Sequence, residues 1–266
     1  MKKKYALVTG ASSGIGLEIS KILASIGFSL VLVARREHNL KRVTKTLINK
    51  YDITADYCVC DLENPNTPQK IYDFCRKKGY FISLLVNNAG YALPDNFHKT
   101  SMEAEEKFLR VLGVSVIALT KLFLIDMIKA KQGKIMMISS VAALAPPSSI
   151  QTLYGPIKTF INRFSEGLNL SYNSFGITST AVCPGYTVTN FHTASGVQQE
   201  MDSVPSFMKK PANRIAREAV DNTLKGKRVC IPTKTYKVIV FLLKLLHHSL
   251  FPLFSKRLAP GRYENN

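Results

Sequence analysis

The sequence predicts an α/β fold in which one doubly wound parallel sheet carries helices on both faces. Apolar, β-branched runs alternate with amphipathic stretches from Tyr5 to Thr233, and a glycine-rich turn directly follows the first run. No shift in composition interrupts this alternation, which is typical of a parallel sheet. The 266 residues, 46% of them hydrophobic, can bury the core of one such domain.

Strands and helices are expected in strict alternation along the chain. The strand runs occupy residues 5–10, 28–35, 55–62, 82–90, 134–140, 176–185 and 228–233. The helical patterns occupy residues 17–27, 39–51, 68–79 and 103–133, begin again near Tyr154, and recur at 213–227. The first helix has apolar residues at helical spacing and ends at Gly27. We therefore expect one domain over residues 1–235 and an apolar C-terminal extension over residues 236–266.

The turn after the first strand reads TGASSGIG and opens the first helix. Glycines allow a tight turn whose backbone N–H groups reach a pyrophosphate at the helix N-terminus. A turn that needs glycine for its shape alone is the alternative. Because strand, turn and helix follow one another, we expect a dinucleotide to bind here. The predicted binding residues are Gly10, Ser12, Ser13, Gly14, Ile15 and Gly16.

Two arginines, Arg35 and Arg36, stand at the end of the second strand. An Asp or Glu at this place would hold the ribose 2′-hydroxyl of NAD. Guanidinium groups instead favour the 2′-phosphate of NADP. Solvated surface arginines are the alternative. The pair predicts NADP(H) as the cofactor.

The charge balance is strongly basic, since 36 Lys and Arg against 18 Asp and Glu give a formal net charge of +18. Such a surface attracts phosphates, anionic cofactors, nucleic acid or anionic lipid alike. No basic stretch with interleaved aromatic residues and no zinc-knuckle spacing favours nucleic acid, so we expect no such partner. No HExxH motif or carboxylate cluster indicates a metal site.

The five cysteines show no CxxC motif. Cys58 and Cys60 share one face of an expected strand, where buried reduced thiols are favoured over a C-x-C metal site that lacks further ligands nearby. The N-terminal apolar run breaks at Thr9 and Gly10, too early for a signal peptide. Reduced thiols and this early break predict a cytoplasmic protein.

Six short motifs together resemble the short-chain dehydrogenase/reductase family. They occur in the family's order and at about its spacing, and they read TGASSGIG, CDL, NNAG, ISS, YGPIK and PGYTVT. The resemblance implies a Rossmann fold and an oxidoreductase that acts on a ketone or a secondary alcohol. It also implies a homo-oligomer, because family members are commonly dimers or tetramers.

The resemblance implies roles for residues along the nucleotide. Asp61 and Leu62 would lie against the adenine. The adenosine half and the sheet would be supported by Asn88, Ala89 and Gly90. The nicotinamide end would be bound by Pro184, Gly185, Val188 and Thr189, together with Tyr154 and Lys158.

The resemblance also implies the catalytic residues. Tyr154 would be the general acid/base, and Lys158 would hold the nicotinamide ribose and prime the tyrosine. Ser140 would orient the substrate oxygen, but Ser139 stays an alternative because the Ser140–Tyr154 interval is one residue longer than the commonest family spacing. Elementary chemistry agrees, since residues four apart share a helix face and a nearby cation favours the phenolate.

One departure from the family pattern concerns the long helix. Members usually carry an asparagine there that kinks the helix and relays protons through water to the lysine, and this sequence has Leu112. Leucine cannot hydrogen-bond, so the relay is rerouted or lost. A second hypothesis therefore stands beside the enzyme: a dinucleotide-binding sensor or scaffold with weak or no turnover.

The C-terminal part is expected to supply the substrate lid and an apolar helix. Residues from about 190 to 212 fit a lid with apolar contacts from Phe191, Val204, Phe207 and Met208. The segment 236–258 is too short in its uninterrupted apolar run to span a membrane. It could lie on an anionic membrane surface, making the protein peripheral to a membrane, or pack over the pocket or against a partner subunit. The expected substrate is a small hydrophobic carbonyl or alcohol compound.

Overall fold

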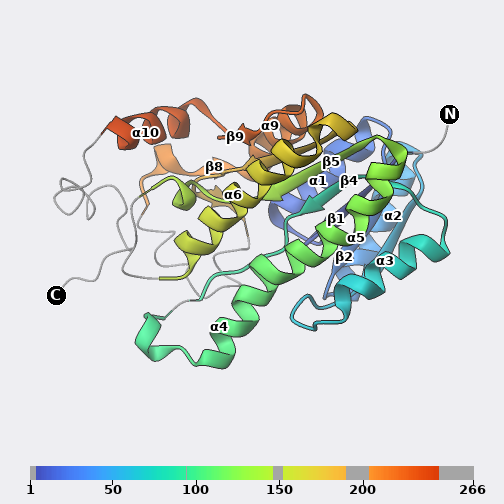
Figure 1. Ribbon diagram of the computed structural model, residues 1–266, viewed down its shortest axis with the longest axis horizontal. Coiled ribbons are helices and arrows are strands. Elements are labelled where there is room, and N and C mark those ends of the chain that lie inside the picture. Colours follow the sequence, from blue (N-terminus) through green and yellow to red (C-terminus); the bar gives the residue numbers. More distant parts are fainter. Residues whose placement is uncertain (1–3, 94, 146–151, 190–203, 246–266) are drawn as a thin grey trace.

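A computed structural model describes residues 4–93, 95–145, 152–189 and 204–245 of the chain. Within them, seven parallel strands form the central sheet (Figure 1). In spatial order they are β3 (Ala55–Val59), β2 (Ser29–Ala34), β1 (Tyr5–Thr9), β4 (Ile82–Asn87), β5 (Gly133–Ile138), β6 (Ile177–Val182) and β9 (Val229–Cys230). The strand order reverses beside β1, which pairs with both β2 and β4. The predicted doubly wound sheet is confirmed, and its crevice lies beyond the strand ends at this reversal.

Helices cover both faces of the sheet (Figure 1). One face carries α1 (Gly14–Ser25), α2 (Glu37–Tyr51) and α9 (Ala212–Leu224). The other carries α3 (Thr67–Lys77), α5 (Ser115–Ala130) and α6 (Tyr154–Tyr172). Because helices lie on both sides, the central strands β1 and β4 are buried at every residue, which explains their largely apolar runs.

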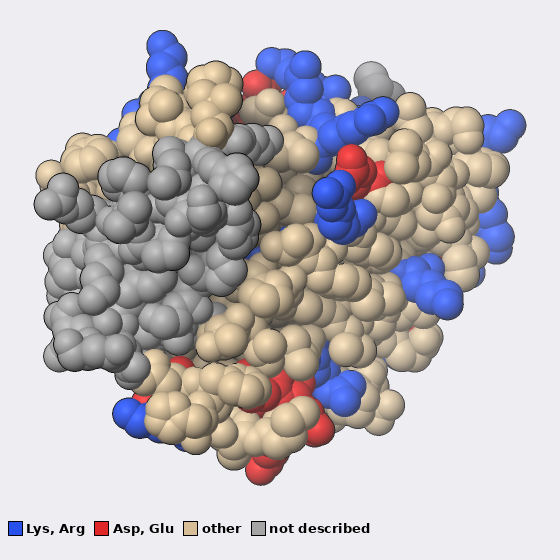
Figure 2. Space-filling model, turned by 60° about the vertical axis from the view of Figure 1, so that its left-hand side comes forward, with Lys and Arg blue, Asp and Glu red and all other residues tan. Residues whose placement is uncertain are grey.

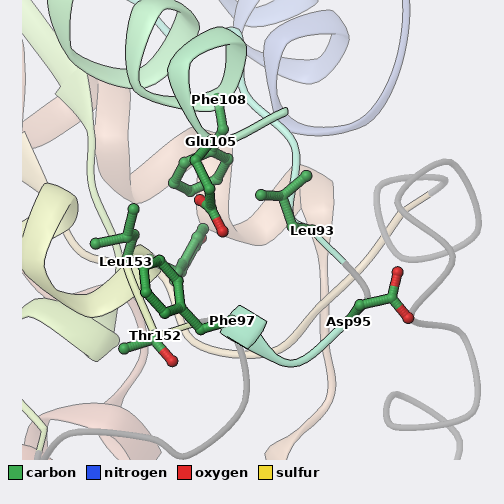
Figure 3. A pocket seen from close by; sticks show the side chains of 8 residues that line it. Leu93, Asp95, Phe97, Glu105, Phe108, Thr152 and Leu153 are labelled. Carbon is green, nitrogen blue, oxygen red and sulfur yellow. The ribbon is translucent and has the colours of Figure 1, made fainter. Parts of the chain in front are cut away.

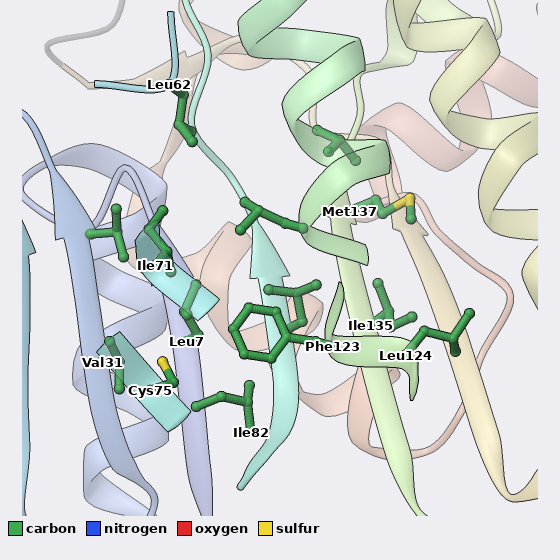
Figure 4. Packing of buried hydrophobic residues seen from close by; sticks show 14 of the residues in the cluster. Leu7, Val31, Leu62, Ile71, Cys75, Ile82, Phe123, Leu124, Ile135 and Met137 are labelled. Atoms are coloured by element: carbon green, nitrogen blue, oxygen red, sulfur yellow. The ribbon is translucent and has the colours of Figure 1, made fainter. Parts of the chain in front are cut away.

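Alternate residues of each strand face different helices. Every residue of β1 is buried. Leu7 pairs in register with Val31 and Leu85, and all three belong to the cluster under α3 and α5 (Figure 4). Their neighbours in the strand, Ala6 and Val8, pack instead against the α1 side. The sheet is therefore fixed in register by both layers.

The long helical stretch of the sequence consists of three parts. The helix α4 (Met102–Leu109) begins at Ser101, whose side chain accepts a hydrogen bond from the Ala104 N–H. A π-helical turn, η2 (Arg110–Val114), then leads into α5. By length and composition, Met102–Ala130 could cross a membrane, but 56% of its apolar window is buried. It serves here as a core helix of the sheet.

The remaining described elements lie around the loops. Short 3₁₀ turns occur at η1 (Phe97–Lys99), η3 (Val141–Ala143), η4 (Asn173–Phe175) and η5 (Ser206–Met208). A small two-stranded sheet pairs β7 (Thr187–Val188) with β8 (Lys210–Pro211). The last described helix is α10 (Lys234–Leu245). Of the expected lid, residues 190–203 with Phe191 lie outside the described residues, as do residues 246–258 of the expected apolar segment.

Candidate active site

The glycine turn is fastened to the end of β4. The Asn88 amide donates to the carbonyl oxygens of Thr9 at 2.8 Å and Gly10 at 3.3 Å. The Thr9 hydroxyl in turn accepts from the backbone N–H groups of Asn88 at 2.9 Å and Ala89 at 3.0 Å. A Cβ on Gly16 would lie 2.4 Å from the Asn88 amide nitrogen, so only glycine permits this approach. The Asn88 side chain therefore holds the glycine turn in place through its hydrogen bonds to the carbonyl oxygens of Thr9 and Gly10.

The N-terminus of α1 leaves room for an anion. Its N-cap, Ser13, has an extended backbone and makes no side-chain capping bond. The first-turn N–H groups therefore lack a side-chain cap, and a helix terminus of this kind suits a pyrophosphate. Thr189 lies against the same turn, with its side chain 3.3 Å from where a Cβ on Gly14 would stand. The glycine turn and the segment after Gly185 thus meet.

The ends of β2 and β3 bring a basic and an acidic group together. Arg35 has a side chain that is 62% exposed, and its guanidinium lies 3.6 Å from Asp61 and 3.5 Å from Glu63. Arg36 is exposed at the start of α2. Asp61 also accepts from the Glu63 N–H at 3.0 Å, while Leu62 is buried. Long, exposed ion pairs of this kind are weak, so the arginines can still turn toward an added phosphate.

Tyr154 and Lys158 share one face of α6, as their spacing predicts. The Lys158 ammonium nitrogen lies 5.5 Å from the centre of the Tyr154 ring. It also donates to the Ile138 carbonyl oxygen at 2.8 Å, at the end of β5. Lys158 is buried, and burial lowers the pKa of its ammonium to about 8. At neutral pH the group is still mostly charged beside the phenol.

The two serines after β5 differ in their hydrogen bonds. The Ser139 hydroxyl donates to the Lys158 carbonyl oxygen at 3.0 Å, so its hydrogen is used to hold α6 against the sheet. The Ser140 hydroxyl oxygen accepts from the Ala142 N–H at 3.1 Å, and its own hydrogen has no acceptor among the described residues. Both side chains are buried. The Ser139 hydroxyl therefore already donates within the protein, whereas the Ser140 hydroxyl can donate to a ligand.

The position of the missing asparagine falls within the π-helical turn. Leu112 is buried and packs beside Gly90, with its Cγ 3.6 Å from where a Cβ on that glycine would stand. The neighbouring Gly113 lies against Ile157, in the helix that carries Tyr154 and Lys158. A π-helical turn interrupts the regular helix without an asparagine. The irregular backbone of this helix is thus present although the asparagine side chain usual in the family is absent.

The turn at Pro184 and Gly185 is held by an aromatic residue of α10. The Tyr236 ring lies so close that a Cβ on Gly185 would stand 1.9 Å from its Cζ. The Tyr236 hydroxyl accepts from the Tyr186 N–H and donates to the Met208 carbonyl oxygen, both at 2.9 Å. Tyr236 packs with the buried Val204 and Met208. Of the other expected nicotinamide residues, Pro184 is buried and Val188 is 58% exposed.

A cleft opens beside Tyr154 (Figure 3). Its empty space of about 230 Å³ includes open solvent, and its cavity volume is about 10 Å³, room for about one water molecule or one small polar group. Its walls are mostly apolar, and the lining residues are Leu93, Asp95, Phe97, Glu105, Phe108, Thr152, Leu153 and Tyr154. An apolar cleft with few polar groups next to a phenol suits a small organic substrate.

The basic side chains on one face of the molecule and the cysteines of the described residues are distributed as follows. On the face shown in Figure 2, Lys and Arg side chains are scattered and do not join into one patch. All five cysteines are free, and the sulfur atoms of Cys58 and Cys60 lie 3.2 Å apart. Among the described residues no group of three or more His, Cys, Asp or Glu could hold a metal ion.

Comparison with known proteins agrees with this architecture. The family model described as short chain dehydrogenase matches residues 4–200. The very-long-chain 3-oxoacyl-CoA reductase of Anas platyrhynchos is 32% identical over 222 residues, which cover 81% of this chain and 67% of that protein. The inactive hydroxysteroid dehydrogenase-like protein 1 of Homo sapiens is 30% identical over 199 residues, which cover 72% and 58%.

A solved structure shows the same fold with a cofactor. The short-chain dehydrogenase from Sphingobium yanoikuyae in complex with NADPH superposes with a TM-score of 0.82. It is 26% identical, and the match covers 95% of each chain.

The fold and the family match place the chain among oxidoreductases of the Rossmann type, a class that includes a solved structure bound to NADPH. The chain belongs to the short-chain dehydrogenase family, as the six sequence motifs predict. The uncapped α1 terminus and the exposed arginines fit the anionic groups of such a cofactor.

Several residues of the site were not predicted from the sequence, among them Tyr236 and Glu105. Tyr236 fixes the Gly185 turn across some fifty positions of sequence, and no local pattern signals such a contact. Glu105 lines the cleft, but in the run EAEE it looks like one of several solvated acids in a first helical turn. Only its place on the buried side of α4 distinguishes it.

Proposed function

We propose that the protein is an NADP(H)-dependent oxidoreductase that reduces a ketone, or oxidises a secondary alcohol, of a small and largely apolar substrate. The observation that carries this proposal is the placing of Ser140, Tyr154 and Lys158 at the end of β5 and the start of α6. A buried ammonium lies 5.5 Å from a phenol ring that lines an apolar cleft. Few structural roles would require that arrangement.

Each residue has a definite task in this proposal. A nicotinamide dinucleotide, when bound, supplies or accepts the hydride. Tyr154 gives its hydroxyl proton to the substrate oxygen during reduction and takes it back in the reverse reaction. Lys158 favours the phenolate through its charge, while the Ile138 carbonyl holds the ammonium in place. Ser140 donates to the oxygen where negative charge develops, and Ser139 stays a structural residue because its hydrogen is already used.

The preference for NADP(H) rests on Arg35 and Arg36. Their guanidinium groups stand at the end of β2, where the ribose 2′ position lies in this class of fold. The 3.5 Å and 3.6 Å pairs of Arg35 are long enough to be exchanged for a phosphate. We propose that the 2′-phosphate binds to the guanidinium groups of Arg35 and Arg36. Asp61 would then hold Arg35 in place beside the adenine.

The alternative of a cofactor-binding protein without turnover is favoured by Leu112 and by the name of one relative. A human relative bears the word inactive in its name, so loss of activity occurs among similar chains. We nevertheless favour an enzyme, because the phenol, the ammonium and a donor-capable serine are all retained. The π-helical turn at Leu112 also keeps the helix irregular at this place.

Contact with an anionic membrane surface is supported by α10. Four of its apolar side chains, spaced along one face, are more than half exposed: Val238, Phe241, Leu242 and Leu245. The opposite face, with Tyr236 and Val240, is buried. An exposed apolar stripe on a chain of net charge +18 suits an anionic bilayer. Co-sedimentation with anionic liposomes should fall when Phe241 and Leu242 are replaced by Ser, and unchanged binding would end the membrane hypothesis.

A homo-oligomer is supported by exposed apolar side chains on α5 and α6. Ile125 is 51% and Leu170 is 73% exposed. Isolated exposed residues are ordinary, but an interface between copies of the chain would cover such positions. Light scattering on the purified protein measures the assembly, and a monomer at all concentrations would refute this part.

The function is tested by following NADPH absorbance while a panel of ketones is offered to the purified protein. The proposal expects turnover of apolar ketones, with NADPH preferred to NADH. Tight NADPH binding without reduction of any ketone or oxidation of any secondary alcohol would establish the sensor or scaffold in its place.

A further inference from the structure

One oxygen of a buried carboxylate in the cleft lacks a hydrogen-bond partner among the described residues. Glu105 is 6% exposed, and its Oε2 has no hydrogen-bond partner among the described residues. Leaving a buried charged oxygen unpaired costs more than leaving a neutral one unpaired, and native structures contain few such groups. The residue therefore requires an explanation.

The second carboxylate oxygen is only partly satisfied. Glu105 Oε1 lies 2.6 Å from the Thr100 hydroxyl. That hydroxyl also lies 2.9 Å from the Phe97 carbonyl oxygen. A hydroxyl has one hydrogen and cannot donate fully to both acceptors. The carboxylate is thus short of donors at both oxygens.

The surroundings of Glu105 point to a ligand. Its carboxylate points into the space between Leu93, Phe97 and Leu153 (Figure 3). Among the described residues, the lining of the cleft contains no Lys or Arg, and Tyr154 lines the same cleft. A donor that enters this cleft would satisfy Glu105 while the adjacent phenol acts on another atom of the same molecule.

We propose that Glu105 binds a hydroxyl group of the substrate, at a distance from the carbonyl on which Tyr154 acts. This inference rests on the proposed function and narrows its substrate class to apolar ketones that carry a second, hydrogen-bond-donating group. Apolar walls receive the skeleton, and one charged acceptor selects the hydroxyl. A substrate with an anionic group at this end is disfavoured, because Glu105 and the exposed Asp95 would repel it.

The experiment compares pairs of substrates in wild type and variants. Methyl ketones of increasing chain length are each paired with the counterpart that carries a terminal hydroxyl, and kcat/KM is measured for both. At the matching length, wild type should prefer the hydroxylated ketone by about tenfold or more, the factor expected of a hydrogen bond to a charged group. The difference should lie mainly in KM, because the contact is made in the ground state as well.

The variants separate binding from general damage. Glu105→Leu should bring the ratio close to one, and Glu105→Gln, which keeps an acceptor, should retain part of it. Glu106→Gln alters the neighbouring exposed acid and should leave the ratio as in wild type. Because the readout is a ratio within each protein, a general change in activity cancels.

Two results would overturn the proposal. One is no preference for a hydroxylated ketone at any chain length in wild type. The other is the same preference in Glu105→Leu, most tellingly if that variant also melts at a lower temperature, which would make Glu105 a structural residue. Calorimetric binding of the same pairs to protein loaded with NADP⁺ gives the ratio without turnover. A Glu105-dependent preference in a protein that reduces nothing would support this site and refute only the proposed activity.

Discussion

The Lys158 ammonium lies 5.5 Å from the centre of the Tyr154 ring and is held there by the Ile138 carbonyl oxygen. Burial is the main reason that the pKa of this lysine falls to about 8, against an ordinary value near 10.4 in an unfolded chain. The folded protein thus keeps a costly charge in its interior for the sake of the neighbouring phenol. Because of that cost, the burial of the Lys158 ammonium can be measured through the pH dependence of the free energy of unfolding.

The pH dependence of stability should reveal the buried lysine. Between pH 8 and about pH 10, the unfolded chain binds this proton and the folded protein does not. The contribution of Lys158 to the free energy of unfolding therefore rises with pH across this window, by on the order of 2 to 3 kcal/mol. Urea unfolding at several pH values measures it. Lys158→Met should lack this rise, and parallel curves for the two proteins would mean that Lys158 titrates normally.

The arginine pair should decide between the two cofactors. Replacing Arg35 and Arg36 by Ala should raise KM for NADPH about tenfold to a hundredfold, since each lost contact is charge-assisted. KM for NADH should change little. Arg76 is a matched control, because it is 63% exposed and lies 3.5 Å from Asp126. Equal effects on the two cofactors, or the same effect from Arg76→Ala, would contradict the assignment.

Two glycines should respond to alanine in opposite directions. A methyl group on Gly185 would meet the Tyr236 ring, so Gly185→Ala should lower the free energy of unfolding by about 1–3 kcal/mol or more. Gly167 lies in α6 with nothing within 4 Å of an added Cβ, so Gly167→Ala should stabilise by about 0.5–1 kcal/mol. Thermal or urea unfolding gives both values. A Gly185→Ala variant with the free energy of unfolding of wild type would show that the Tyr236 ring of α10 does not pack against this turn.

Restoring the family's asparagine should not improve the enzyme. Leu112 is 2% exposed and belongs to the core cluster, so Leu112→Asn buries an amide and should destabilise by about 1–3 kcal/mol. The π-helical turn already interrupts the helix without it. We expect kcat to stay equal or to fall. A tenfold rise in kcat would instead mean that the relay is missing in the natural protein.

The sequence alone predicts those elements and site residues for which a local pattern implies one structure. The strand β1, the glycine turn and α1 follow from an apolar run, three glycines and helical spacing, and they lie as predicted. The Tyr154 and Lys158 pair was predictable because a four-residue interval fixes a shared helix face. Periodicity could not foresee the π-helical turn, because four of its five residues are apolar or glycine and fit an α-helix equally well.

The contacts that the sequence could not provide are long-range ones. Tyr236, in α10, accepts a hydrogen bond from the Tyr186 N–H. Thr9, at the end of β1, accepts one from the Asn88 N–H, just after the neighbouring strand β4. Glu105 is distinguished from the other acids of α4 by its burial and by an oxygen without a hydrogen-bond partner among the described residues. Such features depend on how elements pack, and a single sequence records the elements alone.

The central claim is that Tyr154 exchanges a proton with the substrate oxygen, and Tyr154→Phe tests it most directly. The variant removes one hydroxyl oxygen and keeps the ring beside Lys158. We predict that kcat for ketone reduction falls by at least about a hundredfold, the usual worth of a positioned acid, while NADPH binding stays within about twofold. Ketone reduction at the wild-type rate in this variant would contradict the account.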